Sequence, residues 1–495
     1  MDGSSTEPRS GRDASKGPRG RRDLTSGPIT RTLLMFSLPL FGGNALQSLN
    51  GTVNQIWVSH TLGVNAITAL GNSNIVMMLM LAVIFGVGMA ANILIGQAVG
   101  ARDLGLVKHV MGTATTFFVG LSLVVSLAGG ILAPHILDLM RTPAVSRADA
   151  IIYLRIIFAC VPFMYFFMFM QMAQRGAGDS TTPFWFMALA IVIDITLNPL
   201  LIMGIGPFPR LGIAGPATST LIGQSFSLLV MMIYLYRRKS VLMLHVSELR
   251  LLWPDPTIMK SLIVRGLPMG VQMFVMSGTA VVMISLVNRY GALTSAAYSI
   301  SAIIWGYLQM PTMAIGASVS SMAAQNVGAR RWDRVDRVAR SGVISGLIIT
   351  GSIALLLYAF NSNVLGILLP SRSPAIPLAA HINQTVLWGF VLFSITFSLS
   401  GVVRSTGAVW WPLAIMIVSM VAVRIPFASI LSEKYGADAI WWSFPLGTIT
   451  SAVLTSLYYR FGGWRRARML EGIVAGDAPD AAPVGPPPDT VEAGA

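Results

Sequence analysis

The stretch Gly96–Arg102 (GQAVGAR) returns 228 residues later as Ala324–Arg330 (AQNVGAR). Other residues recur at the same spacing or at one residue more: Gly63 with Gly291, Gly88 with Gly316, Pro39 with Pro268, Arg175 with Arg404, Gly178 with Gly407, and Pro183 with Pro412. A register that drifts by a single residue over so many positions indicates a duplicated unit rather than one chance match.

The composition is that of a membrane protein. The chain is 54% hydrophobic and 11% charged, whereas an ordinary soluble domain is roughly 25% charged. The net charge of +14 does not indicate nucleic-acid binding, because the basic residues lie in short loops between apolar runs and form no basic domain. A duplicated, very apolar chain is typical of a transporter.

Twelve segments are long and apolar enough to cross a bilayer, which takes about 20 residues each. The sequence therefore predicts an all-α membrane protein with twelve transmembrane helices. These segments lie near 33–58, 66–95, 107–133, 148–174, 183–206, 212–237, 258–288, 294–323, 336–362, 378–403, 409–431 and 438–460.

The loops predict the orientation. The face that carries the N-terminal tail holds 26 Lys and Arg, and the other face holds 6. The positive-inside rule then places both termini in the cytoplasm of a bacterial-type cytoplasmic membrane. Six helices in each half give two parallel repeats with a cavity between two bundles.

These patterns divide the chain into five parts. We expect a disordered tail over 1–30, a six-helix lobe over 31–237, a cytoplasmic linker over 238–257, a second six-helix lobe over 258–465, and a disordered tail over 466–495. Both tails are rich in Pro, Gly, Ala or Ser and have too few apolar residues to fold. The linker contains an amphipathic stretch, Val241–Leu252, that suits the membrane surface.

Several motifs together resemble the multidrug and toxic compound extrusion (MATE) family, in its DinF-like branch. They are the repeated Q-x-V-G-A-R, Leu38-Pro39 with Leu267-Pro268, Arg175–Pro183 (RGAGDSTTP), and Asn198–Ile202 (NPLLI). The resemblance covers about residues 30 to 465. It implies a monomeric secondary transporter that exports organic cations and other drugs by alternating access, in antiport with H⁺ or Na⁺.

One acid lies in the middle of a predicted helix. Asp194 is followed at i+4 by Asn198 on the same helical face, and Pro199 disrupts the local backbone hydrogen bonds. A buried carboxylate in a membrane is costly and is a functional candidate by default. We interpret Asp194 as the coupling residue, and a structural Asp that hydrogen-bonds a neighbouring helix is the alternative.

The first segment offers polar partners for this acid. Asn44, Gln47, Gly51 and Asn54 form one helical stripe, and we predict that Gln47, Asn54, Asp194 and Asn198 form the coupling site. The branch that the chain resembles often has Asp where this chain has Asn54, and N-x-x-x-D-P where this chain reads D-x-x-x-N-P. One carboxylate among amides favours H⁺; Na⁺ at Asp194 is the alternative, and no other metal or cofactor is expected.

The second half has no matching acid. Arg424 lies in the region that matches Asp194, and we expect a structural role for it. A substrate cavity between the halves is expected to be lined by Gln272, Met276, Tyr298, Trp305, Gln309 and Met310. Aromatic and Met walls suit amphipathic cations, and ordinary helix packing is the alternative for each residue.

Other functions fit less well. An enzyme is not expected, because the five histidines are scattered and the chain has neither H-E-x-x-H nor a Walker A motif. A flippase or exporter of lipid-linked or other endogenous metabolites, from the same wider superfamily, is the main alternative. A flippase would be expected to line its cavity with Arg and Lys for phosphates, and the central segments have almost none.

Overall fold

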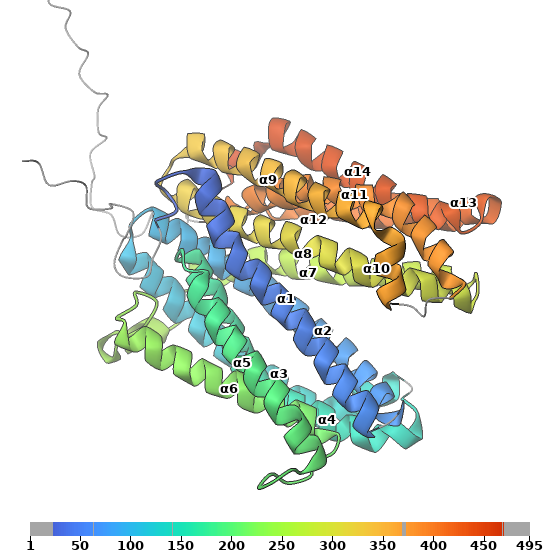
Figure 1. Cartoon of the computed structure of the whole chain (residues 1–495). Coiled ribbons are helices and arrows are strands. Elements are labelled where there is room, and N and C mark those ends of the chain that lie inside the picture. The colour runs from blue at the N-terminus through green and yellow to red at the C-terminus, as the bar shows by residue number, and fades with distance from the viewer. Residues whose placement is uncertain (1–22, 63, 141, 369–372, 468, 470–495) are drawn as a thin grey trace, which may run out of the picture.

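The computed structural model describes residues 23–62, 64–140, 142–368, 373–467 and 469 (Figure 1). Within these residues the regular structure is helical throughout, which confirms the predicted all-α fold. The expected disorder of 1–22 and of 470–495 lies outside the described residues.

The first half forms one bundle of six long helices, the N-terminal lobe. They are α1 (Ile29–Leu62), α2 (Val64–Gly100), α3 (Leu104–Leu139), α4 (Ala144–Gly176), α5 (Thr181–Met203) and α6 (Ala214–Arg237).

The second half repeats this bundle as the C-terminal lobe. Its elements are α7 (Pro256–Asn288), α8 (Ala292–Gly328), α9 (Trp332–Ala359), α10 (Asn361–Leu368), α11 (Ala375–Ser405), α12 (Trp410–Met416), the π-helix η2 (Ile417–Arg424), α13 (Ile425–Tyr435) and α14 (Asp438–Phe461). Because α12, η2 and α13 follow one another without a break, they form one composite helix, so each lobe contains six long helices.

Nine of the described helices meet the length and hydropathy of a membrane span, among them the composite Trp410–Tyr435. The other three long helices are α1 and α8, which pack along helices of both lobes, and α14, which packs within the C-terminal lobe. Their polar and aromatic residues lower their hydropathy. The predicted twelve-span architecture agrees with this arrangement.

The helix ends of the two motif copies are built alike. Arg102 and Arg330 each follow the end of a long helix and take a left-handed backbone conformation, with φ of 59° and 57°. Asp103 then caps α3 by accepting a hydrogen bond from the Leu106 N–H at 2.8 Å, which satisfies one of the free donors of the first turn.

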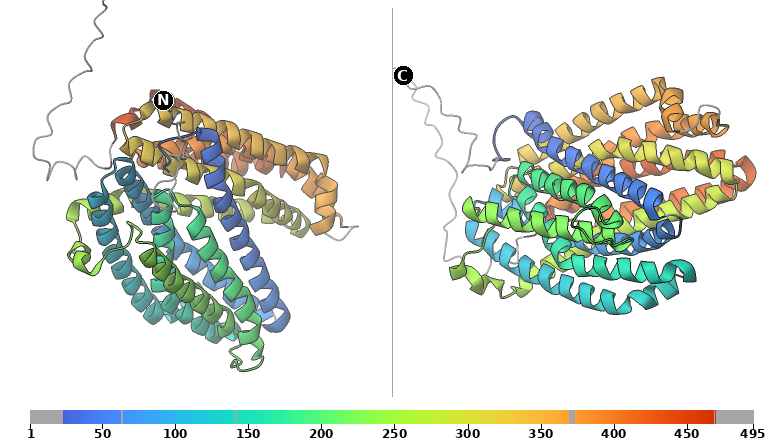
Figure 2. Two further views of the ribbon diagram at one scale, coloured as in Figure 1. Left: turned by 60° about the vertical axis from the view of Figure 1, so that its left-hand side comes forward. Right: turned by 60° about the horizontal axis from the view of Figure 1, so that its bottom comes forward.

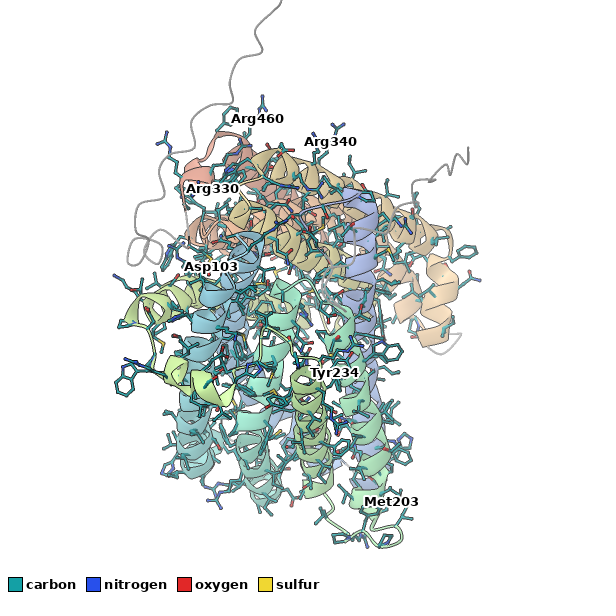
Figure 3. All side chains as sticks on the ribbon, turned by 90° about the vertical axis from the view of Figure 1, so that its left-hand side faces the viewer. Asp103, Met203, Tyr234, Arg330, Arg340 and Arg460 are labelled. Carbon is teal, nitrogen blue, oxygen red and sulfur yellow. The ribbon has the colours of Figure 1, made fainter. Side chains whose placement is uncertain are left out.

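The two lobes converge at the end where α1 begins and α14 ends, here called the terminal end, and diverge toward the other end, the far end (Figure 1). The left view of Figure 2 shows the same divergence. In Figure 3, Arg330, Arg340 and Arg460 lie in the upper part, whereas Met203 lies at the foot of the N-terminal lobe.

Glycines allow α2 and α7 to cross at the interface between the lobes. A Cβ on Gly86 would lie 2.2 Å from the carbonyl oxygen of Gly266 and 2.4 Å from the backbone nitrogen of Gly270. Such an approach is possible only where no side chain stands between the backbones. The interface is therefore built by small residues, as in other membrane helix pairs.

The linker after α6 contains a 3₁₀ helix, η1 (Val246–Leu252), that packs on α3. Glu248 accepts a hydrogen bond from Lys108 of α3. This contact, together with the backbone N–H of His245, lowers the pKa of Glu248 from its ordinary 4.5 to about 2. Its contribution to stability is therefore fully present above pH 4.5 and is lost as the pH falls through about 2. Val246 and Trp253 are 80% and 84% exposed, which suits the predicted place at the membrane surface.

Apart from shifts of a few residues at helix ends, three features differ from the prediction. Residues 23–28 belong to the folded part rather than to a disordered tail, because Leu24 is fully buried against the C-terminal lobe. The predicted span 336–362 ends at Ala359, and α10 continues from it as a short separate helix. The predicted span 409–431 contains a π-helix, which hydropathy does not reveal because apolar content does not report the hydrogen-bond register.

Candidate functional site

Asp194 lies on α5, on the face that packs against α1 and α6 inside the N-terminal lobe. Its side chain is 3% exposed. Among the described residues, no Lys, Arg or His forms an ion pair with it. A buried carboxylate without a cation must be stabilised by hydrogen-bond donors.

One oxygen of this carboxylate is held by amides of α1. Oδ2 of Asp194 accepts hydrogen bonds from the Nδ2 atoms of Asn50 at 2.9 Å and Asn54 at 3.0 Å. Because Asn50 and Asn54 are one helical turn apart, both amides point to the same side of α1. The carboxylate thus ties α1 to α5.

The other oxygen is held by hydroxyls of α6. Oδ1 of Asp194 accepts from Ser219 Oγ at 2.5 Å and from Thr220 Oγ1 at 3.2 Å. Each hydroxyl also has a second acceptor, the carbonyl oxygen of Pro216, at 2.9 Å and 3.0 Å respectively. Four neutral donors from two helices therefore surround this buried acid.

Asn198 extends this cluster by one turn of α5. Its Nδ2 donates to Oδ1 of Asn54 at 2.6 Å. The Oδ1 atoms of Asn198 and Asn50 are buried and have no hydrogen-bond partner. Two unpartnered oxygens beside a carboxylate are suited to accept a proton donor, a water molecule or a small cation.

The structure brings together three of the four residues predicted for this site. Asp194, Asn54 and Asn198 are in direct contact through hydrogen bonds, whereas Gln47 is exposed on α1, nearly one turn before Asn50. Asn50, Ser219 and Thr220 were missed. The i−4 spacing from Asn54 was a signal for Asn50, but the sequence contains no signal that places α6 beside Asp194.

Two residues predicted to line a substrate cavity lie inside the C-terminal lobe instead. Tyr298 and Trp305 are 6% and 4% exposed, and their ring centroids are 5.6 Å apart. Both rings also pack on Phe444 of α14. The seven-residue spacing correctly placed both residues on one face of α8. That face packs against α11 and α14, because the two aromatic rings fill the core of the lobe.

The other predicted cavity residues are partly buried on α7 and α8. Oε1 of Gln272 accepts a hydrogen bond from Arg404 Nη1 at 3.1 Å, and its Nε2 is buried without a partner. Met276, Gln309 and Met310 are half-buried. Their predicted contact with a substrate stays a prediction.

Trp305 takes part in a buried polar chain. Its Nε1 donates to Oδ1 of Asn383 at 3.0 Å, and Nδ2 of Asn383 donates to Oδ1 of Asn361 at 3.1 Å. Asn383 is 1% exposed. This series of hydrogen bonds links α8, α11 and α10 and contains no charged group.

Replacement of Asn383 by Ala is expected to lower the thermal stability of the purified protein, because it leaves Trp305 Nε1 and Asn361 Oδ1 without partners. Each unsatisfied buried polar group lowers the free energy of unfolding by about 1–3 kcal/mol. Thermal unfolding in detergent, followed by the loss of monodisperse protein, measures the change. Asn288→Ala is the matched control, since Asn288 is exposed and its side chain accepts a hydrogen bond from the hydroxyl of Ser295. An unchanged melting temperature in Asn383→Ala contradicts the prediction.

The repeated motif joins the lobes at the terminal end with approximate two-fold symmetry. Nε2 of Gln97 donates to the carbonyl of Ser405 in the other lobe at 2.6 Å, and Nε2 of Gln325 donates to the carbonyl of Gly176 at 2.9 Å. A Cβ on Gly100 would lie 1.9 Å from the carbonyl oxygen of Gln325, and one on Gly328 would lie 1.9 Å from that of Gln97. Both motif copies therefore close one end of the space between the lobes.

The segment before α1 reinforces this closure. The Leu24 N–H donates to Oε1 of Gln325 at 3.3 Å, and Asn326 Nδ2 donates to the Leu24 carbonyl at 3.1 Å. Arg334 donates to the carbonyls of Ser26 and Gly27 at 3.2 Å. Residues 24–27 are therefore held against the C-terminal motif and the start of α9.

A family model described as MatE matches residues 39–200 and again residues 268–430, one match in each lobe. The chain belongs to the MatE family. It is therefore a multi-pass membrane transporter and not an enzyme, and the predicted family is confirmed.

Relatives and solved structures agree with this assignment. The chain is 34% identical to the probable multidrug resistance protein YoeA of Bacillus subtilis, over 89% of this chain and 95% of the relative. It is 29% identical to the probable multidrug resistance protein YpnP of the same organism, over 89% and 97%. A solved structure described as the outward-facing conformation of a multidrug resistance MATE family transporter of the MOP superfamily has a TM-score of 0.82 at 20% identity, over 90% of this chain and 98% of that one.

Proposed function

We propose that this MatE protein exports small organic molecules in exchange for protons, and that Asp194 carries the proton. The observation that carries the proposal is the pair of hydroxyls, from Ser219 and Thr220, that donate to Asp194. Each of them has a second acceptor in the Pro216 carbonyl. The names of the relatives, which are multidrug resistance proteins, support drugs and related organic molecules as the substrates.

The two hydroxyls allow Asp194 to change charge without leaving a buried polar group unpaired. When Asp194 is ionised, Ser219 and Thr220 donate to it. When it is protonated, either hydroxyl can rotate to donate to Pro216 and can accept the new carboxyl proton, because a hydroxyl is both a donor and an acceptor. The cluster thus stabilises both protonation states, and protonation weakens the hold of the carboxylate on the amides of Asn50 and Asn54.

Helix α1 connects this change to the other lobe. Besides its contact with α5 at Asp194, α1 packs against α8 and α9 of the C-terminal lobe. An apolar crevice of about 450 Å³ lies between them, lined by Leu34, Met35, Ser37, Leu38, Phe41, Pro311, Ala314, Ile315, Ile349 and Ile353. A shift of α1 on protonation therefore changes contacts between the lobes, as alternating access requires.

The basic loops support the orientation. Because most Lys and Arg of the described residues lie at the terminal end, we assign that end and both chain termini to the cytoplasm. The motifs then close the cytoplasmic side, and the lobes diverge toward the outside. The bacterial relatives support a bacterial cytoplasmic membrane. We expect a monomer, because one chain supplies both lobes and the complete Asp194 cluster.

Sodium is a second candidate for the coupling ion. The unpartnered Oδ1 atoms of Asn50 and Asn198 are hard oxygen ligands of the kind that alkali cations bind. Against this, four donors already occupy the carboxylate of Asp194, so Na⁺ must displace some of them. A proton needs only the rotation of a hydroxyl, and the geometry therefore favours H⁺.

Proteoliposomes with separately imposed H⁺ and Na⁺ gradients test this proposal. They are loaded with either ethidium, a cation, or 2-anthracenecarboxylate, an anion, so that the result does not depend on the charge of the substrate. We expect efflux of at least one dye to follow an H⁺ gradient imposed without Na⁺. Efflux of neither dye, or efflux driven by Na⁺ alone, contradicts the proposed proton coupling.

A further inference from the structure

Arg424 occupies the place in the C-terminal lobe that Asp194 occupies in the N-terminal lobe. The two family matches end at 200 and 430, so each residue lies six positions before the end of its match. Both lie on the fifth long helix of their lobe, and Arg424 is the last residue of the π-helix η2. A π-helix inside a longer helix is rare and is often found at functional sites.

The sixth helix of each lobe meets these residues in the same way. A Cβ on Gly223 of α6 would lie 3.6 Å from the backbone nitrogen of Asp194, and one on Gly447 of α14 would lie 3.4 Å from Cβ and Cδ of Arg424. The residue three positions before each glycine also contacts Asp194 or Arg424, but the kind of contact differs between the lobes. Thr220 donates a hydrogen bond to Asp194, whereas the ring of Phe444 faces the Arg424 guanidinium, 3.5 Å from its centroid.

The guanidinium has no anion to balance it. Among the described residues, no Asp or Glu forms an ion pair with Arg424. Its Nη1 lies 3.6 Å from the sulfur of Met420, and its Nε is buried without a partner. A guanidinium has five N–H donors in a planar fork that matches a carboxylate. A cation left with so few partners in a membrane lobe is suited to bind an anion from outside the chain.

The surroundings of the charge are aromatic. The ring of Phe444 packs on Trp305 and Tyr298, with centroids 4.9 and 6.2 Å away. These rings hold Phe444 against the guanidinium and make its surroundings apolar. An aromatic ligand with one carboxylate complements this combination, because its body packs on rings and its charge pairs with the fork.

We propose that the C-terminal lobe binds the carboxylate of an aromatic organic anion at Arg424, so that amphiphilic anions are among the exported substrates. This proposal rests on the export function for its place in transport, but binding itself does not require an ion gradient. It differs from the cationic class that the sequence favoured and from the structural role expected for Arg424. In this proposal the N-terminal lobe binds the coupling proton at Asp194, and the C-terminal lobe binds the charged group of the substrate at Arg424.

Equilibrium binding to the purified protein in detergent tests this site. The probes are 2-anthracenecarboxylate and its neutral analogue 2-(hydroxymethyl)anthracene, followed by the fluorescence of the anthracene ring. We expect the wild type to bind the carboxylate about tenfold more tightly than the alcohol, as a charge-assisted pair with Arg implies. Arg424→Gln should lose this preference, and Arg424→Lys should retain part of it.

Arg289→Gln is the matched control, because Arg289 is an exposed arginine at the end of α7 in the same lobe, and it should keep the preference. A variant is compared only if its melting temperature lies near that of the wild type; if Arg424→Gln unfolds, Arg424→Lys provides the comparison. Equal affinity of the wild type for both probes, failure to bind the carboxylate, or an unchanged preference in Arg424→Gln overturns the proposal. Arg424-dependent retention of phosphatidylglycerol would assign the site to a lipid and would also overturn it.

Discussion

Asp194→Asn is expected to abolish proton-driven efflux from proteoliposomes, to the level of liposomes without protein. Asn has nearly the same size as Asp and can still accept hydrogen bonds from the donors around it through its amide oxygen. It cannot take up and release a proton in the accessible pH range, however. The variant therefore removes the charge change while the cluster of α1, α5 and α6 stays packed. Dye efflux after a pH jump measures the effect.

Asp179→Asn is the matched control for this experiment. Asp179 accepts hydrogen bonds from the backbone N–H groups of Thr181 and Thr182, at the first turn of α5. Its loss should leave efflux close to that of the wild type. Undiminished efflux in Asp194→Asn, at equal protein incorporation, would show that the proton is carried elsewhere.

Gly100→Val is expected to reduce transport more than tenfold, because the lobes can no longer close at the terminal end. The Cβ that this substitution adds would lie 1.9 Å from the Gln325 carbonyl oxygen, and backbone in the opposing lobe cannot rotate away as a side chain can. The lobes must separate at this end, and the Gln97 and Gln325 bonds must break. Spin labels at Leu104→Cys and Arg340→Cys, on a Cys160→Ala background, report the separation.

A matched substitution distinguishes this effect from a general effect of Val in a helix. Gly120 lies in α3, and a Cβ added there would meet nothing within 4 Å, so Gly120→Val should leave both the label distance and transport near the wild-type values. An unchanged distance distribution in Gly100→Val, with normal transport, would mean that the repeated motif does not close the terminal end.

The duplicated motif and the spacing of apolar runs predicted two six-helix lobes, because both depend only on local residue order. The polar cluster was predicted in part. Asp194 and Asn198 share a face of one helix, and Asn54 lies in a polar stripe, so periodicity alone relates them. Ser219 and Thr220 follow no such pattern, and their role arises only when α6 packs beside α5.

The C-terminal lobe shows where such reasoning fails. Tyr298 and Trp305 lie on one face, as predicted, but periodicity does not say whether that face meets a cavity or other helices. The partners that bury them, Phe444 and Asn383, come from α14 and α11, far away in the sequence. The sequence placed Arg424 in the region that matches Asp194, but its contact with the ring of Phe444 becomes clear only in three dimensions.

The most direct test of proton coupling at Asp194 is the distance between the labels at Leu104→Cys and Arg340→Cys as a function of pH, without substrate. In the otherwise wild-type protein, the distance distribution should shift between two states as the pH changes, because we propose that the charge of Asp194 sets the contacts of α1. In Asp194→Asn the distribution should not change with pH. A pH-dependent shift of the same size in Asp194→Asn would contradict the account.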